Sequence, residues 1–156
     1  MTTHRGNATE IATEYANSVK KIVCIGGDGT FNEVISGVMK ANSNTPIGYI
    51  PAGSTNDFAA SLKLPTSILQ AAADIVEGTP VRYDVGKFGD RYFTYVASFG
   101  AFTRASYTTP QSIKNALGHL AYVLDGIQEL SQIRLVHIKM IIDGDEVEDD
   151  FIFGAI

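Results

Sequence analysis

The residues best suited to chemistry form a short glycine cluster, Gly26-Gly-Asp-Gly-Thr30, between an apolar run and an amphipathic segment. Glycines let a backbone approach a bulky anion closely, and the N–H groups that open a helix point toward it. Asp28 is unusual beside an anion, and its carboxylate makes sense if a metal ion or ordered water stands between. A structural alternative is a tight strand-to-helix turn with Thr30 as N-cap, because short glycine motifs are weakly specific.

A second polar loop, Pro51-Ala-Gly-Ser-Thr-Asn-Asp57, also follows an apolar run and precedes a helical segment. It offers hydroxyls, an amide and a carboxylate on a bend that contains a glycine. Ligands of α/β proteins bind at the carboxyl ends of the strands, so two such loops at one sheet edge predict a shared pocket. The alternative is a capped turn, in which Ser54 or Thr55 caps the next helix.

The segments around these loops alternate between helix and strand, which predicts a layered α/β sheet. The apolar run that precedes the glycine cluster predicts a buried parallel strand, because it is short and rich in β-branched residues. The predicted segments are a helix from a capping box of Asn7 and Glu10 to about Asn17, a strand over 21–25, a helix over 30–41, a strand over 47–50, a short helix that Pro65 ends, and a helix from Ser67 to Glu77 that Gly78 stops.

After Pro80 the pattern changes to the alternation typical of antiparallel strands. The predicted segments are a hairpin of 81–85 and 92–98 with its turn at 88–91, a helix over 111–130, and a hairpin of 135–142 and 147–156 turned by Asp143-Gly144. We therefore expect an α/β domain over residues 1–79 and the start of a β-rich domain over 80–156. Because the chain opens on a helix and stops within a predicted strand, we expect both ends to continue in a longer protein.

Composition limits the classes of function. Hydrophobic residues make up 45% of the 156 residues, which allows a packed core, and no apolar run is long enough to span a membrane. The lone Cys24 lies in an apolar run and is interpreted as a buried thiol of a reducing cytoplasm. The formal charge of −5 argues against a nucleic-acid partner. Six acids within residues 143–150 account for all of this negative charge, and the rest of the chain is near neutral, so an anionic membrane would not repel it. The three histidines, His4, His119 and His137, form no metal-ligand pattern.

The two loops together carry a family resemblance. Gly26-Gly-Asp-Gly-Thr-Phe-Asn-Glu-Val34 with Pro51-Ala-Gly-Ser-Thr-Asn-Asp-Phe-Ala59 resembles the catalytic domain of diacylglycerol and sphingosine kinases, and the bacterial soluble branch most of all. NAD kinases and phosphofructokinases share the glycine motif, but the Asn32-Glu33 pair and the second motif make the match specific. Weaker similarity at residues 2–8, 95–105 and 117–122 extends the resemblance over nearly the whole chain.

This resemblance implies a fold, a cofactor and a set of site residues. The fold would be an NAD-kinase-like and phosphofructokinase-like α/β nucleotide-binding domain, followed by part of a mostly antiparallel β-sandwich domain, with the active site between them. The cofactors would be ATP and Mg²⁺. The implied nucleotide-binding residues are Thr2, Gly26, Gly27, Asp28, Gly29, Thr30, Phe31, Asn32, Glu33, Gly53, Ser54, Thr55, Asn56 and Asp57. Ser54 stands where the family usually has Thr and keeps the hydroxyl.

The implied reaction is phosphoryl transfer from ATP to a lipid hydroxyl, with diacylglycerol favoured over phosphatidylglycerol or a sphingoid base. The protein would be cytoplasmic and peripheral to the membrane, and an unpaired strand would invite a homodimer. In the family, the catalytic Asp lies in an Asp-Gly-Glu or similar segment. Asp143-Gly-Asp-Glu146 resembles that segment, but its pattern is typical of a hairpin turn. We therefore expect the catalytic base beyond Ile156 and expect this chain alone to be inactive. The alternatives are an NAD-kinase-like enzyme with a soluble substrate and a non-catalytic nucleotide-binding module.

Overall fold

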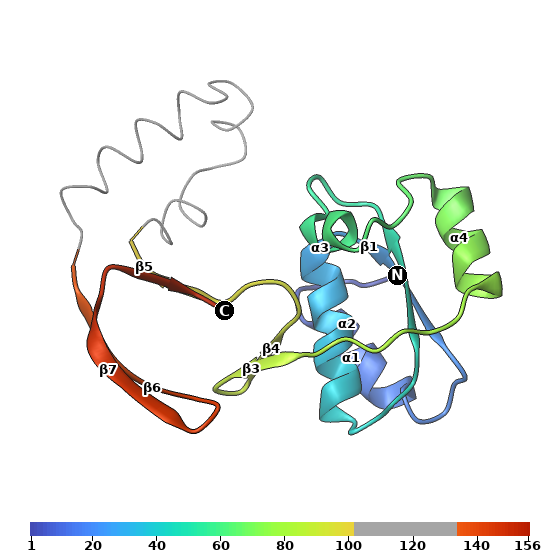
Figure 1. The fold of residues 1–156 in the computed structure, drawn as a ribbon. Coiled ribbons are helices and arrows are strands. Elements are labelled where there is room, and N and C mark those ends of the chain that lie inside the picture. Colours follow the sequence, from blue (N-terminus) through green and yellow to red (C-terminus); the bar gives the residue numbers. More distant parts are fainter. Residues whose placement is uncertain (102–133) are drawn as a thin grey trace. The chain divides into compact units, whose positions relative to one another are not determined.

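The computed structural model describes residues 1–101 and 134–156 of the chain (Figure 1). The helix predicted over 111–130 lies outside the described residues. The chain divides into two compact units, Met1–Tyr95 and Val96–Ile156. The segment after residue 79, with which we expected the second domain to begin, therefore packs with the first unit as far as Tyr95. The predicted domain boundary itself stays a prediction.

The first unit has the predicted α/β order. Its helices and first strands are α1 (Asn7–Tyr15), β1 (Ile22–Gly26), α2 (Asp28–Lys40), β2 (Ile47–Pro51), α3 (Asp57–Ser61) and α4 (Ile68–Glu77). The two strands are parallel, and their register runs from Ile22 opposite Ile47 to Gly26 opposite Pro51. This register places the carboxyl ends of both strands at the same level, and both polar loops leave the sheet there.

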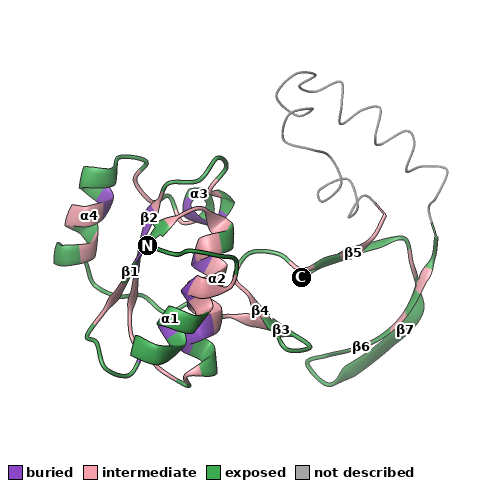
Figure 2. Ribbon diagram, turned by 180° about the vertical axis from the view of Figure 1, so that it is seen from behind, coloured by how far each residue is buried: buried purple, intermediate pink, exposed green. Residues whose placement is uncertain are grey.

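The core of this unit lies between the strand pair and the helices α1 and α2 (Figure 2). Small residues let the two helices approach closely: a Cβ on Gly37 of α2 would lie 2.5 Å from the carbonyl oxygen of Thr9 on α1. Cys24 is 3% exposed, and burial raises the pKa of its thiol to about 11, which confirms a buried thiol. On the other side of the sheet, α4 packs on β2.

The predictions for β1 and for the start of α1 are wrong in part. The strand β1 is buried on one face only, because Val23 and Ile25 on its other face are 50% and 62% exposed. The helix α1 is not opened by a capping box: its N-cap is Gly6 with φ of 89°, and Asn7 lies inside the helix. The Asn7 amide instead donates to the Glu10 carboxylate over 2.9 Å, a bond that lowers the pKa of Glu10.

The ends of α4 and α3 follow the sequence more closely. The Ser67 hydroxyl accepts from the Gln70 amide at 3.5 Å and opens α4, as predicted, and Gly78 follows its last residue. The short helix α3 ends at Ser61, ahead of Pro65, which lacks the N–H that a helix needs.

The hairpin after Pro80 exists, but its strands are shorter and shifted. The strands β3 (Gly86–Phe88) and β4 (Arg91–Phe93) pair antiparallel around Gly89, which has φ of 57°. Residues 81–85 form no strand, so that part of the prediction is wrong. Alternating residues form a strand only where a partner strand can bond their backbone, and the two-residue turn sets that pairing at 86–93.

The described part of the second unit is antiparallel. The strands β6 (Val136–Ile142) and β7 (Asp145–Phe151) form the predicted hairpin, with positive φ at both turn residues, Asp143 and Gly144. The strand predicted to continue to Ile156 breaks after Phe151. Its last piece, β8 (Phe153–Ala155), pairs with β5 (Ser98–Gly100) instead.

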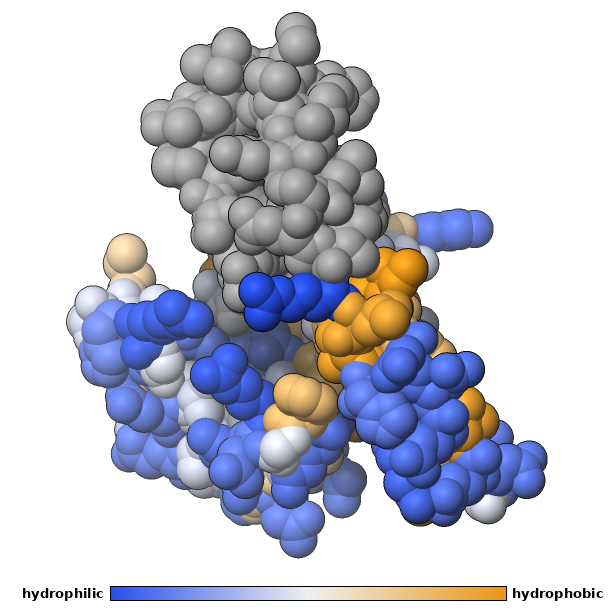
Figure 3. Space-filling model, turned by 90° about the vertical axis from the view of Figure 1, so that its left-hand side faces the viewer, coloured by the Kyte–Doolittle hydropathy of each residue, from blue (hydrophilic) through white to orange (hydrophobic). Residues whose placement is uncertain are grey.

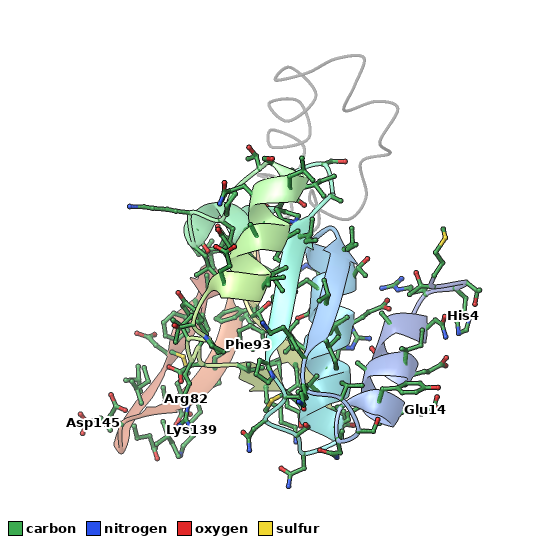
Figure 4. All side chains as sticks on the ribbon, turned by 90° about the vertical axis from the view of Figure 1, so that its right-hand side faces the viewer. His4, Glu14, Arg82, Phe93, Lys139 and Asp145 are labelled. Carbon is green, nitrogen blue, oxygen red and sulfur yellow. The ribbon has the colours of Figure 1, made fainter. Side chains whose placement is uncertain are left out.

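Charged side chains line one face of the β6–β7 hairpin. Lys139 pairs with Glu146 at 2.7 Å, and His137 lies between Glu148 and Asp150 (Figure 4 labels Lys139 on this hairpin).

One view of the molecular surface is mainly hydrophilic, with a compact hydrophobic group among the polar side chains (Figure 3). Among the described residues, no helix is both long enough and apolar enough to cross a membrane.

Candidate functional site

The first loop presents unpaired backbone amides. The strand β1 ends at Gly26, and α2 begins at Asp28 with the extended Gly27 as its N-cap, so the alternative with Thr30 as N-cap is wrong. The Phe31 amide closes the first turn on the Gly27 carbonyl at 3.0 Å. Within the described residues, the amides of the three residues before Phe31 have no acceptor. These N–H groups, at the positive end of the helix dipole, are suited to bind an anion.

The second loop is fixed by one side chain. Asn56 has left-handed backbone angles, with φ of 53°. Its Oδ1 accepts from the Gly53 amide and its Nδ2 donates to the Gly53 carbonyl, both at 2.9 Å. Ser54 and Thr55 lie on the bend between them and are exposed. The alternative in which one of these hydroxyls caps α3 is therefore wrong, because Asn56 occupies the N-cap position.

The two loops lie in direct contact. A Cβ on Gly53 would lie only 2.5 Å from the Cα of Gly27, and a Cβ on Gly27 would lie 3.1 Å from the Cα of Gly53. Just before this contact, the Ala52 amide donates to the Gly26 carbonyl at 2.8 Å and extends the ladder of the parallel strands. A side chain on Gly53 would therefore force the loops apart, whereas a side chain on Gly27 would require a smaller displacement.

Asp28 joins the two loops. Its carboxylate accepts from the amides of Asp57 at 3.0 Å and Phe58 at 3.2 Å, which are the first two amides of α3. The Asp28 side chain thus caps α3 from another segment of the chain, a role that helix N-caps normally fill from within. This accounts for a carboxylate beside the predicted anion site, because both of its oxygens accept hydrogen bonds from α3.

Three further residues of the predicted site make contacts inside the chain. Phe31 stacks on Tyr49 and Phe58, with ring centroids 4.3 and 5.0 Å apart. Asn32 donates to the Tyr92 carbonyl at 3.1 Å and holds β4 against α2. Glu33 accepts from the amide of Gly6 at 2.9 Å and holds the start of α1. Contact of these three side chains with a nucleotide stays a prediction.

The groups left for a ligand are few. Within the described residues, the side chains of Thr2, Thr30, Ser54 and Thr55 make no hydrogen bond. A Cβ on Gly29 would meet nothing within 4 Å, so the space beside the start of α2 is open. No hydrogen bond of the described residues joins Thr2 to either loop, and its part in the site stays a prediction. The free amides of α2 and three hydroxyls form the set that can meet phosphate oxygens.

These groups fit ATP better than they fit a metal ion alone. The three free amides are donors of the kind that bind phosphate in α/β proteins. No three carboxylate, imidazole or thiol groups of the described residues lie together as candidate ligands for a metal. The Mg²⁺ ion stays a prediction, and an ion of this kind is commonly held by substrate phosphates with one or two carboxylates.

Sequence reasoning missed one residue near the site. Tyr49 lies on β2, 6% exposed, and its hydroxyl is buried without a hydrogen-bond partner in the described structure. Burial, followed by the charge of Asp28 and then Cys24, raises the pKa of Tyr49 to about 12. The signal in the sequence was the polar group itself, since Tyr49 is the only hydroxyl in the run Ile47-Gly-Tyr-Ile50.

Comparison with known proteins shows which family the chain is similar to. The family model described as the diacylglycerol kinase catalytic domain matches residues 1–88. The chain belongs to this family. It is 40% identical over 139 residues to a protein of Staphylococcus saprophyticus named diacylglycerol kinase, covering 89% of this chain and 45% of that protein. A protein of the same name from Staphylococcus carnosus is 39% identical over 140 residues, covering 89% and 46%.

Solved structures agree as well. A crystal structure described as a diacylglycerol kinase of Bacillus anthracis superposes with a TM-score of 0.76 at 28% sequence identity, covering 99% of this chain and 50% of that one. The predicted α/β fold class is thereby confirmed. The chain spans about half the length of the relatives it matches.

Proposed function

We propose that the chain is part of an ATP-dependent lipid kinase that phosphorylates the hydroxyl of diacylglycerol or a similar lipid. The observation that carries the proposal is the joint of the two loops, where free amides and exposed hydroxyls meet on one sheet edge. The family match supports the kinase class, and the name shared by its relatives supports diacylglycerol over phosphatidylglycerol or a sphingoid base.

The chain's own groups would hold the nucleotide by its phosphates. The amides of Asp28, Gly29 and Thr30 would donate to phosphate oxygens, and the hydroxyls of Ser54 and Thr55 would add donors from the second loop. ATP supplies the phosphoryl group when bound, and positioning with charge stabilisation provides most of the catalysis in such reactions. Asp28 would act as a positioning residue, because it holds the second loop against the first.

The acceptor hydroxyl needs a base that we place outside this chain. Asp143 and Gly144 form the turn of the β6–β7 hairpin, which supports the turn interpretation of the Asp143–Glu146 segment. The general base is expected beyond Ile156, so the chain alone would bind ATP without transferring phosphate. We further propose peripheral contact with the cytoplasmic membrane face, and association of two copies remains a prediction for sedimentation measurements.

The test is transfer of labelled phosphate from Mg-ATP to diacylglycerol in mixed micelles, with the Staphylococcus saprophyticus relative as positive control. ATP binding by the chain is measured in parallel by calorimetry. The proposal expects ATP binding without transfer from the chain and transfer from the relative. Absence of ATP binding would refute the nucleotide site, whereas transfer by the chain alone would refute the placement of the base. Phosphorylation of NAD in place of lipid would favour the soluble-substrate alternative.

A further inference from the structure

The hydroxyl of Tyr49 is buried in the core beneath the two loops. The side chain extends from β2, the residue is 6% exposed, and its Oη has no hydrogen-bond partner among the described residues. Buried polar groups without a partner are rare in native proteins, because each keeps its desolvation penalty with no bond to offset it. Such a group calls for a partner or a function.

The ring of Tyr49 is held in place. It stacks on Phe31 with ring centroids 4.3 Å apart, and Phe31 stacks on Phe58 at 5.0 Å. Phe31 follows Asp28 by almost one helical turn of α2, and the amide of Phe58 donates to the Asp28 carboxylate at 3.2 Å. The aromatic stack thus joins Tyr49 of β2 to α2 and α3, the two helices that Asp28 also joins.

The carboxylate of Asp28 is close enough for its charge to contribute to the raised pKa of Tyr49, after burial as the main cause. It is also held in place, by the two α3 amides. A carboxylate has about four acceptor positions, so two bonds leave room for another donor. A buried water needs two or more polar partners, and the Tyr49 hydroxyl and the Asp28 carboxylate are polar groups with bonding positions to spare.

We propose that Tyr49 is a positioning residue of the loop joint, whose hydroxyl donates through one internal water to the Asp28 carboxylate. The bridge orients the carboxylate toward the first amides of α3 and so holds the second loop against the start of α2. Its effect on nucleotide binding rests on the proposed function, whereas the bridge itself does not. The role is positional, since Tyr49 lies beneath the loops and not on their exposed side.

The test is Tyr49→Phe in the whole chain, which removes the hydroxyl and keeps the ring. The matched control is Tyr15→Phe on α1, a residue that is 48% exposed. We expect Tyr49→Phe to lower Tm relative to the control. We also expect hydrogen exchange of the Asp57 and Phe58 amides to quicken on the order of fivefold, the equivalent of one ordinary hydrogen bond. A merely structural loss in the core would not single out these two amides.

Changes in Tm and in hydrogen exchange other than those expected would overturn the proposal. A hydroxyl that is truly unpartnered destabilises the fold, so its removal would raise Tm or leave it unchanged, with unaltered exchange at Asp57 and Phe58. In an Asp28→Asn background, the effect of Tyr49→Phe should shrink; an undiminished effect would show that Tyr49 does not act through Asp28.

Calorimetry with ATP distinguishes the water bridge from the proposed function. If Tm and exchange change as expected but the wild-type chain binds no ATP, the bridge stands and the proposed function fails.

Discussion

Replacing Asp28 by Asn tests the joint between the loops most simply. The Asp28 carboxylate accepts from the amides of Asp57 and Phe58, and Asn keeps only one of these two acceptor oxygens. One α3 amide would then face an NH₂ group, and the charge that assists the remaining bond would be lost. Hydrogen bonds to charged groups are worth about 1.5–3 kcal/mol, and an N-cap is worth about 1 kcal/mol.

Asp28 is half-buried, so solvent screening reduces this value. We therefore expect Asp28→Asn to lower the free energy of unfolding by about 1–2 kcal/mol, or Tm by roughly 3–6 °C. Phosphate transfer by a longer, active form should also fall sharply, because the second loop would lose its anchor.

Urea denaturation followed by circular dichroism measures the stability change, and calorimetry measures ATP affinity. The matched control is Asp84→Asn, the same chemical change at an exposed position that makes no hydrogen bond in the described structure. The reasoning would be refuted if Asp28→Asn were no more destabilising than Asp84→Asn. A loss of ATP binding without loss of stability would instead indicate that Asp28 contacts the nucleotide or its metal directly.

Further predictions follow from the glycine contact, the α4 cap and the hairpin. Gly53→Ala should cost about 1–3 kcal/mol in urea denaturation and weaken ATP binding, because its Cβ would lie 2.5 Å from the Gly27 Cα; Gly29→Ala, which meets nothing within 4 Å, is the matched comparison for steric cost. Ser67→Ala should lower stability by about 1 kcal/mol, since it removes the α4 cap, and unchanged stability would refute that role. Hydrogen bonds from His137 to Asp150 and Glu148 raise the pKa of His137 above its usual 6.5. The stabilisation that protonated His137 gives the folded state is therefore fully present below pH 6.5 and is lost as the pH rises through the raised pKa. A histidine NMR titration should show this and a lower pKa in Asp150→Asn, and an unshifted value would contradict the pairing.

The strand–loop–helix order around the site could be predicted from sequence because its causes are local. Apolar spacing fixes α2, the glycines mark its start, and Ser67 and Gly78 bound α4 within a few residues. The hairpin turn of Asp143 and Gly144 was equally local, since both need positive φ and these residue types accept it.

The joint itself could not be predicted from the sequence. It depends on the parallel register of β1 and β2, which sets Gly26 opposite Pro51 and so brings Gly27 against Gly53. The two strands are parallel and are joined through α2, so no tight turn sets that register. For the same reason, sequence reasoning placed Asp28 beside a predicted anion site but could not show that its carboxylate reaches α3.

Pairing over long distances also explains the misplaced strands. Alternation alone placed a strand at 81–85, where none of the described strands pairs with it, and continued the last strand through residue 152. The structure ends β7 at Phe151 and gives Phe153–Ala155 to β5, whose residues lie far earlier in the chain. Contacts of this length are set by the whole fold and not by the residues on either side.

The most direct test of the central claim is to follow the backbone amides by NMR during titration with ATP and, separately, with adenosine. The account predicts that ATP shifts the amide signals of Asp28, Gly29 and Thr30, together with those of Ser54 and Thr55, and that adenosine leaves the first three nearly unchanged. Equal shifts from both ligands, or ATP-induced shifts elsewhere that leave these amides unaffected, would contradict a phosphate site at the joint of the two loops.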